Sequence, residues 1–178
     1  MSAAPDAPFC LAEALPLLER TPRVLDALLR GLPEAWLAAD EGPQTWSAPL
    51  VVGHLIHGER TDWLPRVRHL REHGETRPFA PFDRFAQLAA PPRALGELLD
   101  EFAALRRASL AELAALELQE GDLARRGRHP ALGTVTLGEL LATWVVHDLD
   151  HLVQIERTMA KRWGGAVGPW AAYLRVVR

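Results

Sequence analysis

The chain has 178 residues, of which 48% are hydrophobic and 24% are charged, and its formal net charge is -3. This composition is typical of a folded globular protein and excludes an intrinsically disordered chain. The acidic balance also argues against a nucleic-acid-binding protein, because phosphates require a concentrated basic face. The length is that of one domain, so we predict a single domain over residues 1–178.

The cysteine content and the apolar runs bear on location. Cys10 is the only cysteine, so no disulfide can form within the chain and nothing indicates an oxidising compartment. The first residues lack the basic start and apolar core of a secretion signal, and the apolar run 140–146 is far too short to span a bilayer. We therefore expect a cytoplasmic protein without a membrane partner.

The first half of the chain predicts two helices. Thr21 followed by Pro22 has the form of a helix start, so we predict a first helix from Pro22 to about Arg30. Ser47 can cap a second, strongly apolar helix. Pro65 removes one backbone hydrogen bond from that helix, which predicts a kink near Thr61 or a break soon after it.

A long loop separates these helices from the next one. Residues 75–92 are rich in proline and phenylalanine, which favours a packed loop with one helical turn. From Ala94 to about Leu118, leucines recur at spacings of three and four, which predicts the third helix. Residues 125–134 read as a connecting loop, and we do not expect His129 within it to be a ligand.

The fourth helix has a clear start. Thr136 and Glu139 fit the capping box, and the apolar stripe that follows runs to about Trp163. A short amphipathic helix over residues 169–177 closes the chain, and we find no alternating strand pattern of convincing length. The predicted class is all-α, a four-helix bundle with a long loop between the second and third helices.

Three histidines are the candidate metal ligands. His147 and His151 are four residues apart and therefore lie one turn apart on one helix face, and His54 lies on the second apolar helix. Three imidazoles suit a divalent ion such as zinc, nickel, iron or manganese and leave positions open. We expect their nitrogens roughly 3 to 4 Å apart; the alternative for His54 is a hydrogen-bonded core residue. Gly58 and Thr61 could leave room for a ligand above the ion.

Two carboxylates are candidate catalytic residues. Asp148 falls near the centre of an apolar stripe, where an unpaired charge is costly, so it needs a partner. That partner could be an imidazole N–H of a ligand or a backbone amide near Trp46 and Ser47. Glu59 faces a choice between a buried partner and a surface ion pair.

The sequence resembles the DinB-like superfamily from about Thr21 to Trp163. The motifs that carry the resemblance are Trp46-Ser47, Gly53-His54-Leu55 with Glu59, His129-Pro130 with Gly133, Thr136-Leu137-Gly138-Glu139-Leu140-Leu141, and His147-Asp148-Leu149 with His151, Gln154 and Ile155. The resemblance implies a four-helix bundle, often a homodimer, and a divalent metal held at the positions of His54, His147 and His151. It does not imply DNA binding.

Better-understood members of this superfamily are thiol-dependent enzymes that use mycothiol or bacillithiol, including a maleylpyruvate isomerase and thiol S-transferases. The resemblance therefore implies a metal-dependent thiol S-transferase that acts on a small-molecule substrate. One alternative is a metal-dependent hydrolase in which Asp148 or Glu59 assists as a base. The other is a non-catalytic, stress-responsive metal-binding or scaffold protein.

Overall fold

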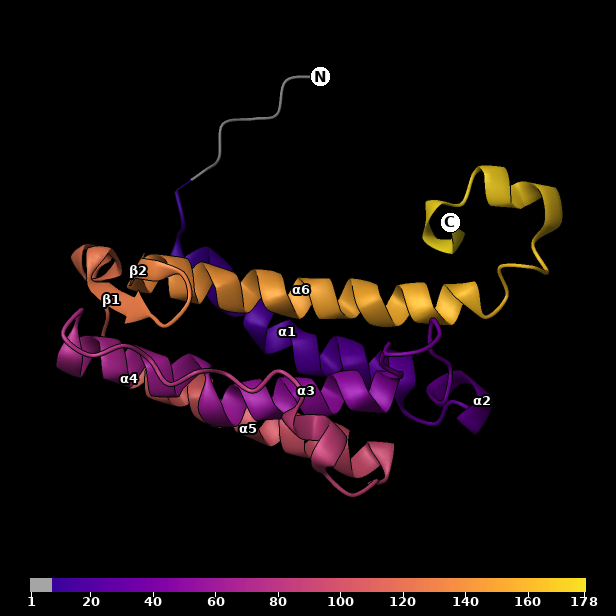
Figure 1. Cartoon of the computed structure of the whole chain (residues 1–178), viewed down its shortest axis with the longest axis horizontal. Helices are drawn as coiled ribbons and strands as arrows, with labels where there is room; N and C mark the ends of the chain where they lie inside the picture. The colour runs from indigo at the N-terminus through magenta and orange to yellow at the C-terminus, as the bar shows by residue number, and fades with distance from the viewer. Residues whose placement is uncertain (1–7) are drawn as a thin grey trace.

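The computed structural model describes residues 8–178 and is built mainly of helices (Figure 1). The helices are α1 (Leu11–Leu29), α2 (Glu34–Leu37), α3 (Ala48–Thr61), α4 (Trp63–His73), α5 (Leu95–Ala115) and α6 (Leu137–Lys161). The strands are β1 (Arg126–His129) and β2 (Gly133–Thr136), and the short 3-10 turns are η1 (Ala86–Ala89), η2 (Glu120–Ala124), η3 (Gly168–Ala172) and η4 (Arg175–Val177). The single-domain prediction includes residues 1–7, which lie outside the described part of the chain.

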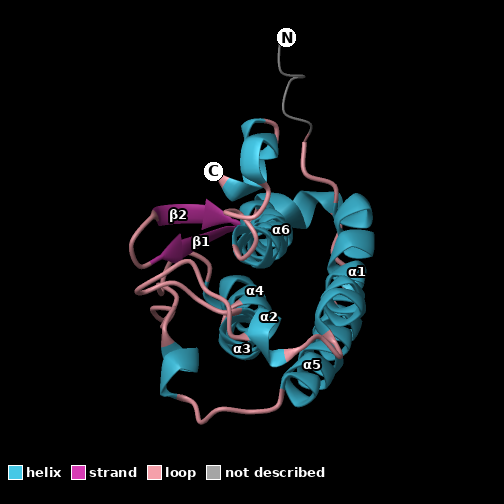
Figure 2. Cartoon of the chain, turned by 90° about the vertical axis from the view of Figure 1, so that its right-hand side faces the viewer, coloured by secondary structure: helices cyan, strands magenta, loops and turns pink. Residues whose placement is uncertain are grey.

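The long helices form a closed ring. Helix α3 packs against α5, α5 against α1, α1 against α6, and α6 against both α3 and α4. In the end-on view of Figure 2, α1 and α5 lie on one side of α3, α4 and α6, whereas the hairpin and the loop before α5 lie on the other. The four-helix-bundle prediction is confirmed, with α3 and α4 together forming its second helix. Within residues 8–178, no helix has the length and apolar character needed to cross a membrane.

The predicted start of the first helix is wrong. Helix α1 begins at Leu11 and runs through Pro22 without ending. Thr21 does not cap it; its hydroxyl donates back to the carbonyl oxygen of Leu17 at 3.2 Å. Pro22 lacks a backbone N–H, so the carbonyl of Leu18 has no partner within the helix and is free to accept from elsewhere.

The second helix breaks where proline predicts it. Helix α3 ends at Thr61 and α4 begins at Trp63, and Asp62 between them has φ -111° and ψ -70°. Ser47 precedes α3, but its side chain makes no capping hydrogen bond; only its carbonyl oxygen accepts from the amide of Val51. The predicted break is therefore confirmed, and the predicted capping role of the Ser47 side chain is wrong.

The segment predicted as a connecting loop contains an antiparallel hairpin. Strands β1 and β2 have four residues each, too short to produce an alternating pattern in the sequence. Gly127 in β1 lies against the core, where a Cβ atom would be 2.9 Å from Leu70 and 3.1 Å from Phe79. The amide of Phe79 donates to the carbonyl of Arg128 at 2.9 Å, which fixes the long loop to the hairpin.

The remaining elements agree with the sequence in part. Thr136 and Glu139 form the capping box at the start of α6: the amide of Glu139 donates to Oγ1 of Thr136 at 3.1 Å, and the amide of Thr136 donates to the Glu139 carboxylate at 2.6 Å. The loop over residues 75–92 contains one helical turn, η1, as predicted. The short C-terminal helix is present as two separate 3-10 helices, η3 and η4, and not as one continuous helix over residues 169–177.

Two hydrophobic clusters fill the bundle. One lies toward the hairpin and includes Trp63, Leu70, Phe79 and Trp144. The other lies toward α2 and is built around Phe102 and the buried leucines, valines and isoleucines of α1, α3, α5 and α6. The candidate functional residues lie where these two clusters meet.

Candidate metal centre

The structure brings the three predicted histidines together between α3 and α6. Nε2 of His147 lies 3.2 Å from Nε2 of His54 and 3.1 Å from Nε2 of His151. One nitrogen from each ring lies within 4.8 Å of the other two. The helical spacing of His147 and His151 explains their contact, whereas the approach of His54 depends on the packing of α3 against α6. The two printed separations agree with the expected 3 to 4 Å, so the three nitrogens are close enough to share one ion.

The ring nitrogens have different partners. Nδ1 of His151 lies 2.8 Å from Oε1 of Gln154. An amide oxygen only accepts, so Nδ1 carries the proton and Nε2 keeps its lone pair for a ligand bond. Nδ1 of His54 and Nδ1 of His147 are buried and have no hydrogen-bond partner among residues 8–178.

Burial keeps these imidazoles neutral. Burial, and next the charge of His151, lowers the pKa of His54 to about 4, although the Arg84 backbone and the Gln87 side chain act in the opposite direction. Burial, together with the other two histidines, lowers the pKa of His147 to about 3. Burial also lowers the pKa of His151, which the hydrogen bond to Gln154 partly offsets. Neutral imidazoles are the form that binds metal, so the donor set fits a divalent ion.

Aromatic rings enclose the histidines. The ring of Trp46 lies 4.9 Å from that of His54, and the ring of Phe82 lies 5.6 Å from it on another side. Trp63 packs edge-on against His147 with ring centroids 5.1 Å apart. These contacts restrict the imidazoles to one arrangement and exclude water from part of their surroundings.

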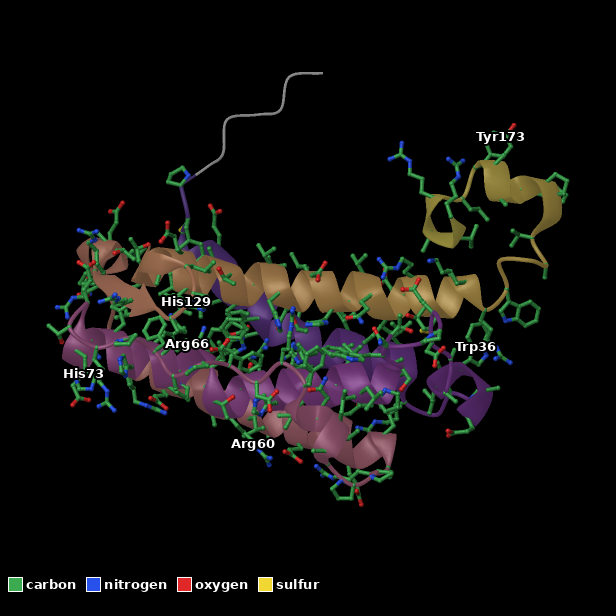
Figure 3. The ribbon with its side chains drawn as sticks, in the orientation of Figure 1. Trp36, Arg60, Arg66, His73, His129 and Tyr173 are labelled. Carbon is green, nitrogen blue, oxygen red and sulfur yellow. The ribbon has the colours of Figure 1, made fainter. Side chains whose placement is uncertain are left out.

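A cleft of about 640 Å³ opens onto the histidines. All three histidines line it, and it extends from the hairpin to the loop that precedes α3. Figure 3 shows Arg66 and His129 at its hairpin end, between α4 and the start of α6. His129 belongs to β1, and its Nδ1 accepts from the amides of Ala131 and Leu132, both at 3.1 Å, so it serves the turn of the hairpin.

The predicted room near Gly58 is taken by a side chain. A Cβ atom at Gly58 would lie 3.1 Å from Nε1 of Trp63, so this glycine accommodates the indole ring. Thr61 turns away from the site, where its hydroxyl donates to the carbonyl of His57 at 2.8 Å. The small residues of α3 therefore do not form the ligand space.

Asp148 and Glu59 are both bound to a buried arginine. Arg106, 1% exposed, donates from Nη1 and Nη2 to the two oxygens of Asp148 at 2.6 and 3.0 Å. Its Nε donates to Oε1 of Glu59 at 2.9 Å, and Nη2 lies 2.8 Å from the same oxygen. Trp144 also donates to this oxygen, at 3.1 Å. Neither partner predicted for Asp148 is correct, and Glu59 has the buried partner rather than a surface ion pair.

This ion cluster does not face the cleft. Burial raises the pKa of Glu59 against the opposing effect of Arg106. Asp148 and Glu59 are 1% and 4% exposed, and neither lines the cleft. Their position assigns them to the packing of the helices, and the predicted role as catalytic base finds no support in this geometry.

The cleft offers other carboxylates, which the sequence reasoning missed. Glu41 binds Arg157 and Lys161, which hold its pKa at about 2, and Glu139 is occupied in the capping box. Asp62 is 6% exposed, and burial raises the pKa of its carboxyl although Arg66 lies 2.5 Å away. The signal for Asp62 was its position at the helix break that Pro65 predicts.

Comparison with known proteins identifies the family and agrees with the fold. The family model of the DinB superfamily matches residues 17–155. Among solved structures, YfiT from Bacillus subtilis, described as a probable metal-dependent hydrolase with an unusual four-helix bundle topology, has a TM-score of 0.73 and 20% sequence identity. The match covers 92% of this chain and 91% of YfiT. Among curated protein sequences, none matches. The chain belongs to the DinB superfamily.

Proposed function

We propose that this protein is a divalent-metal-dependent enzyme of the thiol S-transferase kind, which delivers a low-molecular-weight thiol to a small electrophile. The observation that carries the proposal is the cluster of three neutral imidazoles on the wall of a cleft, with no carboxylate among the clustered groups of the described chain. His54, His147 and His151 are the residues that would hold the ion.

The composition of the cluster favours a thiol over water as the nucleophile. A divalent ion lowers the pKa of what it binds, and a thiol starts from a pKa about seven units below that of water, so it ionises without a protein base. Asp148 and Glu59, the nearest buried carboxylates in sequence, are bound to Arg106 and cannot accept that proton from the cleft.

The chain's own residues contribute position and shielding. Gln154 fixes the His151 ring, and Trp46 and Phe82 cover His54. Because these groups are fixed before any ligand arrives, the side chains of the site lose little further freedom when the reactants bind. The aromatic wall gives the electrophile an apolar surface beside the histidines.

The test is a thiol-conjugation assay. Metal-loaded protein is incubated with bacillithiol, mycothiol, glutathione or cysteine and with the fluorogenic electrophile monochlorobimane. We expect conjugation above the rate without enzyme for at least one thiol, and the loss of that acceleration in His54→Ala. His69→Ala, which changes a histidine of α4 outside the cluster, is the matched control. If none of the four thiols reacts faster with the protein than without it, whichever divalent metal is loaded, the proposal is contradicted.

A metal-dependent hydrolase is the second candidate. Asp62 favours it, because this carboxylate lines the cleft and burial raises its pKa, as a general base requires. The description of YfiT as a probable metal-dependent hydrolase supports the same candidate. Hydrolysis of nitrophenyl esters without added thiol, lost in Asp62→Asn, distinguishes it from thiol transfer.

A further inference from the structure

Gln87 is a buried glutamine without a partner. It lies in η1, is 8% exposed, and neither Nε2 nor Oε1 of its amide forms a hydrogen bond with any of residues 8–178. A buried amide left unpaired costs about 1–3 kcal/mol, and such groups are rare in native proteins. The function proposed above has not used this residue, so its burial requires a separate explanation.

A glycine brings Gln87 close to the metal centre. A Cβ atom at Gly53 would lie 3.3 Å from Cβ of Gln87, so the bare backbone of α3 is what allows η1 to approach. Gly53 directly precedes His54 in the chain. The Gln87 side chain is close enough to His54 to raise its pKa, and Nδ1 of His54, like the Gln87 amide, is buried without a hydrogen bond in the described chain.

The neighbouring ligand shows how a glutamine serves an imidazole. Nδ1 of His151 donates to Oε1 of Gln154 at 2.8 Å, which leaves Nε2 directed toward the other two histidines. Histidines that bind metals usually donate their second ring N–H to an oxygen, which fixes the tautomer and the ring orientation. His54 also requires an oxygen acceptor for its Nδ1–H, and the amide oxygen of Gln87 lies nearby without a hydrogen-bond partner.

We propose that Gln87 is a positioning residue, whose Oε1 accepts the Nδ1–H of His54 and holds Nε2 ready for the ion. The inference rests on the metal site of the proposed function. The two glutamines then have parallel roles: Gln154 orients His151 of α6, and Gln87 orients His54 of α3. It also gives the long loop before α5 a role, because that loop delivers an amide group to the metal centre.

The Arg84 backbone is the competing acceptor for His54. It acts on the imidazole in the same direction as Gln87 and belongs to the same loop. A substitution at Gln87 leaves a backbone carbonyl in place, so the two acceptors give different results. If the backbone carbonyl of Arg84 is the acceptor for His54 and Gln87 is not, a substitution at residue 87 has no effect on metal affinity.

The test measures zinc affinity by competition with a chromophoric chelator, using metal-free full-length protein. Gln87→Leu should weaken binding by about 10- to 100-fold, and Gln154→Leu by a similar factor, because each removes one acceptor from a ligand. Gln87→Glu keeps an acceptor at the same place and should bind at least as tightly as wild type. Gln119→Leu, at an exposed position of the chain, is the control and should bind as wild type does.

Urea unfolding of the metal-free variants separates positioning from a structural role. Leucine replaces an unpaired amide by an apolar group of similar size, so Gln87→Leu should fold with a stability equal to or above that of wild type. The absorption spectrum of the cobalt-loaded protein should also change in Gln87→Leu and return in Gln87→Glu. If Gln87→Leu binds zinc as tightly as wild type, or if Gln87→Leu and Gln87→Glu lose the same zinc affinity, the inference about Gln87 is overturned and the proposed function is not. Absence of metal binding by wild type would overturn the proposed function with it.

Discussion

Arg106 donates a hydrogen bond from Nη1 to the backbone carbonyl oxygen of Leu18 at 2.8 Å. The carbonyl is available because Pro22, four residues later in α1, has no N–H to donate to it. With Asp148 and Glu59 on its other sides, Arg106 has partners for all its donor groups. One guanidinium therefore joins α1, α3, α5 and α6, and it lies 5.0 Å from the rings of both Phe102 and Trp144, at the meeting point of the two hydrophobic clusters.

Removal of Arg106 should destabilise the bundle strongly. Arg106→Leu leaves Asp148 and Glu59 as buried carboxylates without a counter-charge, which costs about 3–5 kcal/mol in the free energy of unfolding. Arg68→Leu breaks a surface pair with Glu112 and should cost less than about 1 kcal/mol. Urea unfolding of both variants measures the difference, and equal losses would show that the buried cluster contributes no more than a surface pair.

Acid should destabilise the metal-free protein below the ordinary histidine pKa. His54 and His147 have folded pKa values of about 4 and about 3, below the ordinary histidine value of 6.5. The unfolded chain therefore binds more protons between these values, and stability falls as the pH decreases through this window. Each proton taken up contributes a slope of about 1.4 kcal/mol per pH unit.

The measurement is urea unfolding of metal-free protein from pH 8 to pH 4. Stability should change little through these histidines above pH 7, and His54→Ala should have a shallower acid slope than wild type. A wild-type slope in His54→Ala would contradict the assignment of a buried, neutral imidazole.

Substitution of Asp62 should affect turnover, whereas substitution of Asp148 should affect stability. If the enzyme is a hydrolase, Asp62→Asn should lower turnover by about 10²–10⁴-fold with metal content unchanged, because a general base contributes that much. If it transfers thiols, the same variant should conjugate monochlorobimane within a few-fold of wild type. Asp148→Asn should lower the free energy of unfolding in either case. Turnover lost in Asp148→Asn with full stability would contradict its structural role.

Gly127 should tolerate no larger side chain. A Cβ atom there would lie 2.9 Å from Cδ1 and 3.0 Å from Cγ of Leu70, which is 2% exposed and cannot move into solvent. Overpacking of this kind costs about 1–3 kcal/mol, so Gly127→Ala should lower the unfolding midpoint in urea. Gly121→Ala, where a Cβ atom meets nothing within 4 Å, is the control. Equal midpoints in the two variants would contradict the packing of β1 on α4.

The sequence predicted the elements with strong local signals. The capping box at Thr136 and the break after Thr61 were correct, because both depend on groups within one helical turn. The start of α1 was misplaced because Pro22 looks like a helix beginning, and only its tertiary partner shows why proline is accommodated there. The hairpin was missed because its strands are short and are fixed by the packing of Gly127 against Leu70.

The candidate site was predictable to a similar extent. The spacing of His147 and His151 predicts that their rings meet, and the apolar helix around His54 made it the third candidate, in agreement with the resemblance. Arg106 was missed although it lies four residues after Phe102 and seven before Leu113, within the apolar stripe of α5. An arginine in that position was a usable signal for a buried partner of Asp148. Gln87 gave no such signal, because its approach to His54 follows from the path of a loop.

The central claim, that α3 and α6 together hold one ion, is tested most directly by metal binding to single variants. Metal-free wild type, His54→Ala, His151→Ala and the control His69→Ala are titrated with zinc, nickel, iron and manganese, and circular dichroism checks that each variant is folded. We predict one ion per chain for wild type and His69→Ala with at least one of these metals, and loss of that binding in both His54→Ala and His151→Ala. Full binding by folded His54→Ala would contradict the account, because the ion would then depend on α6 alone.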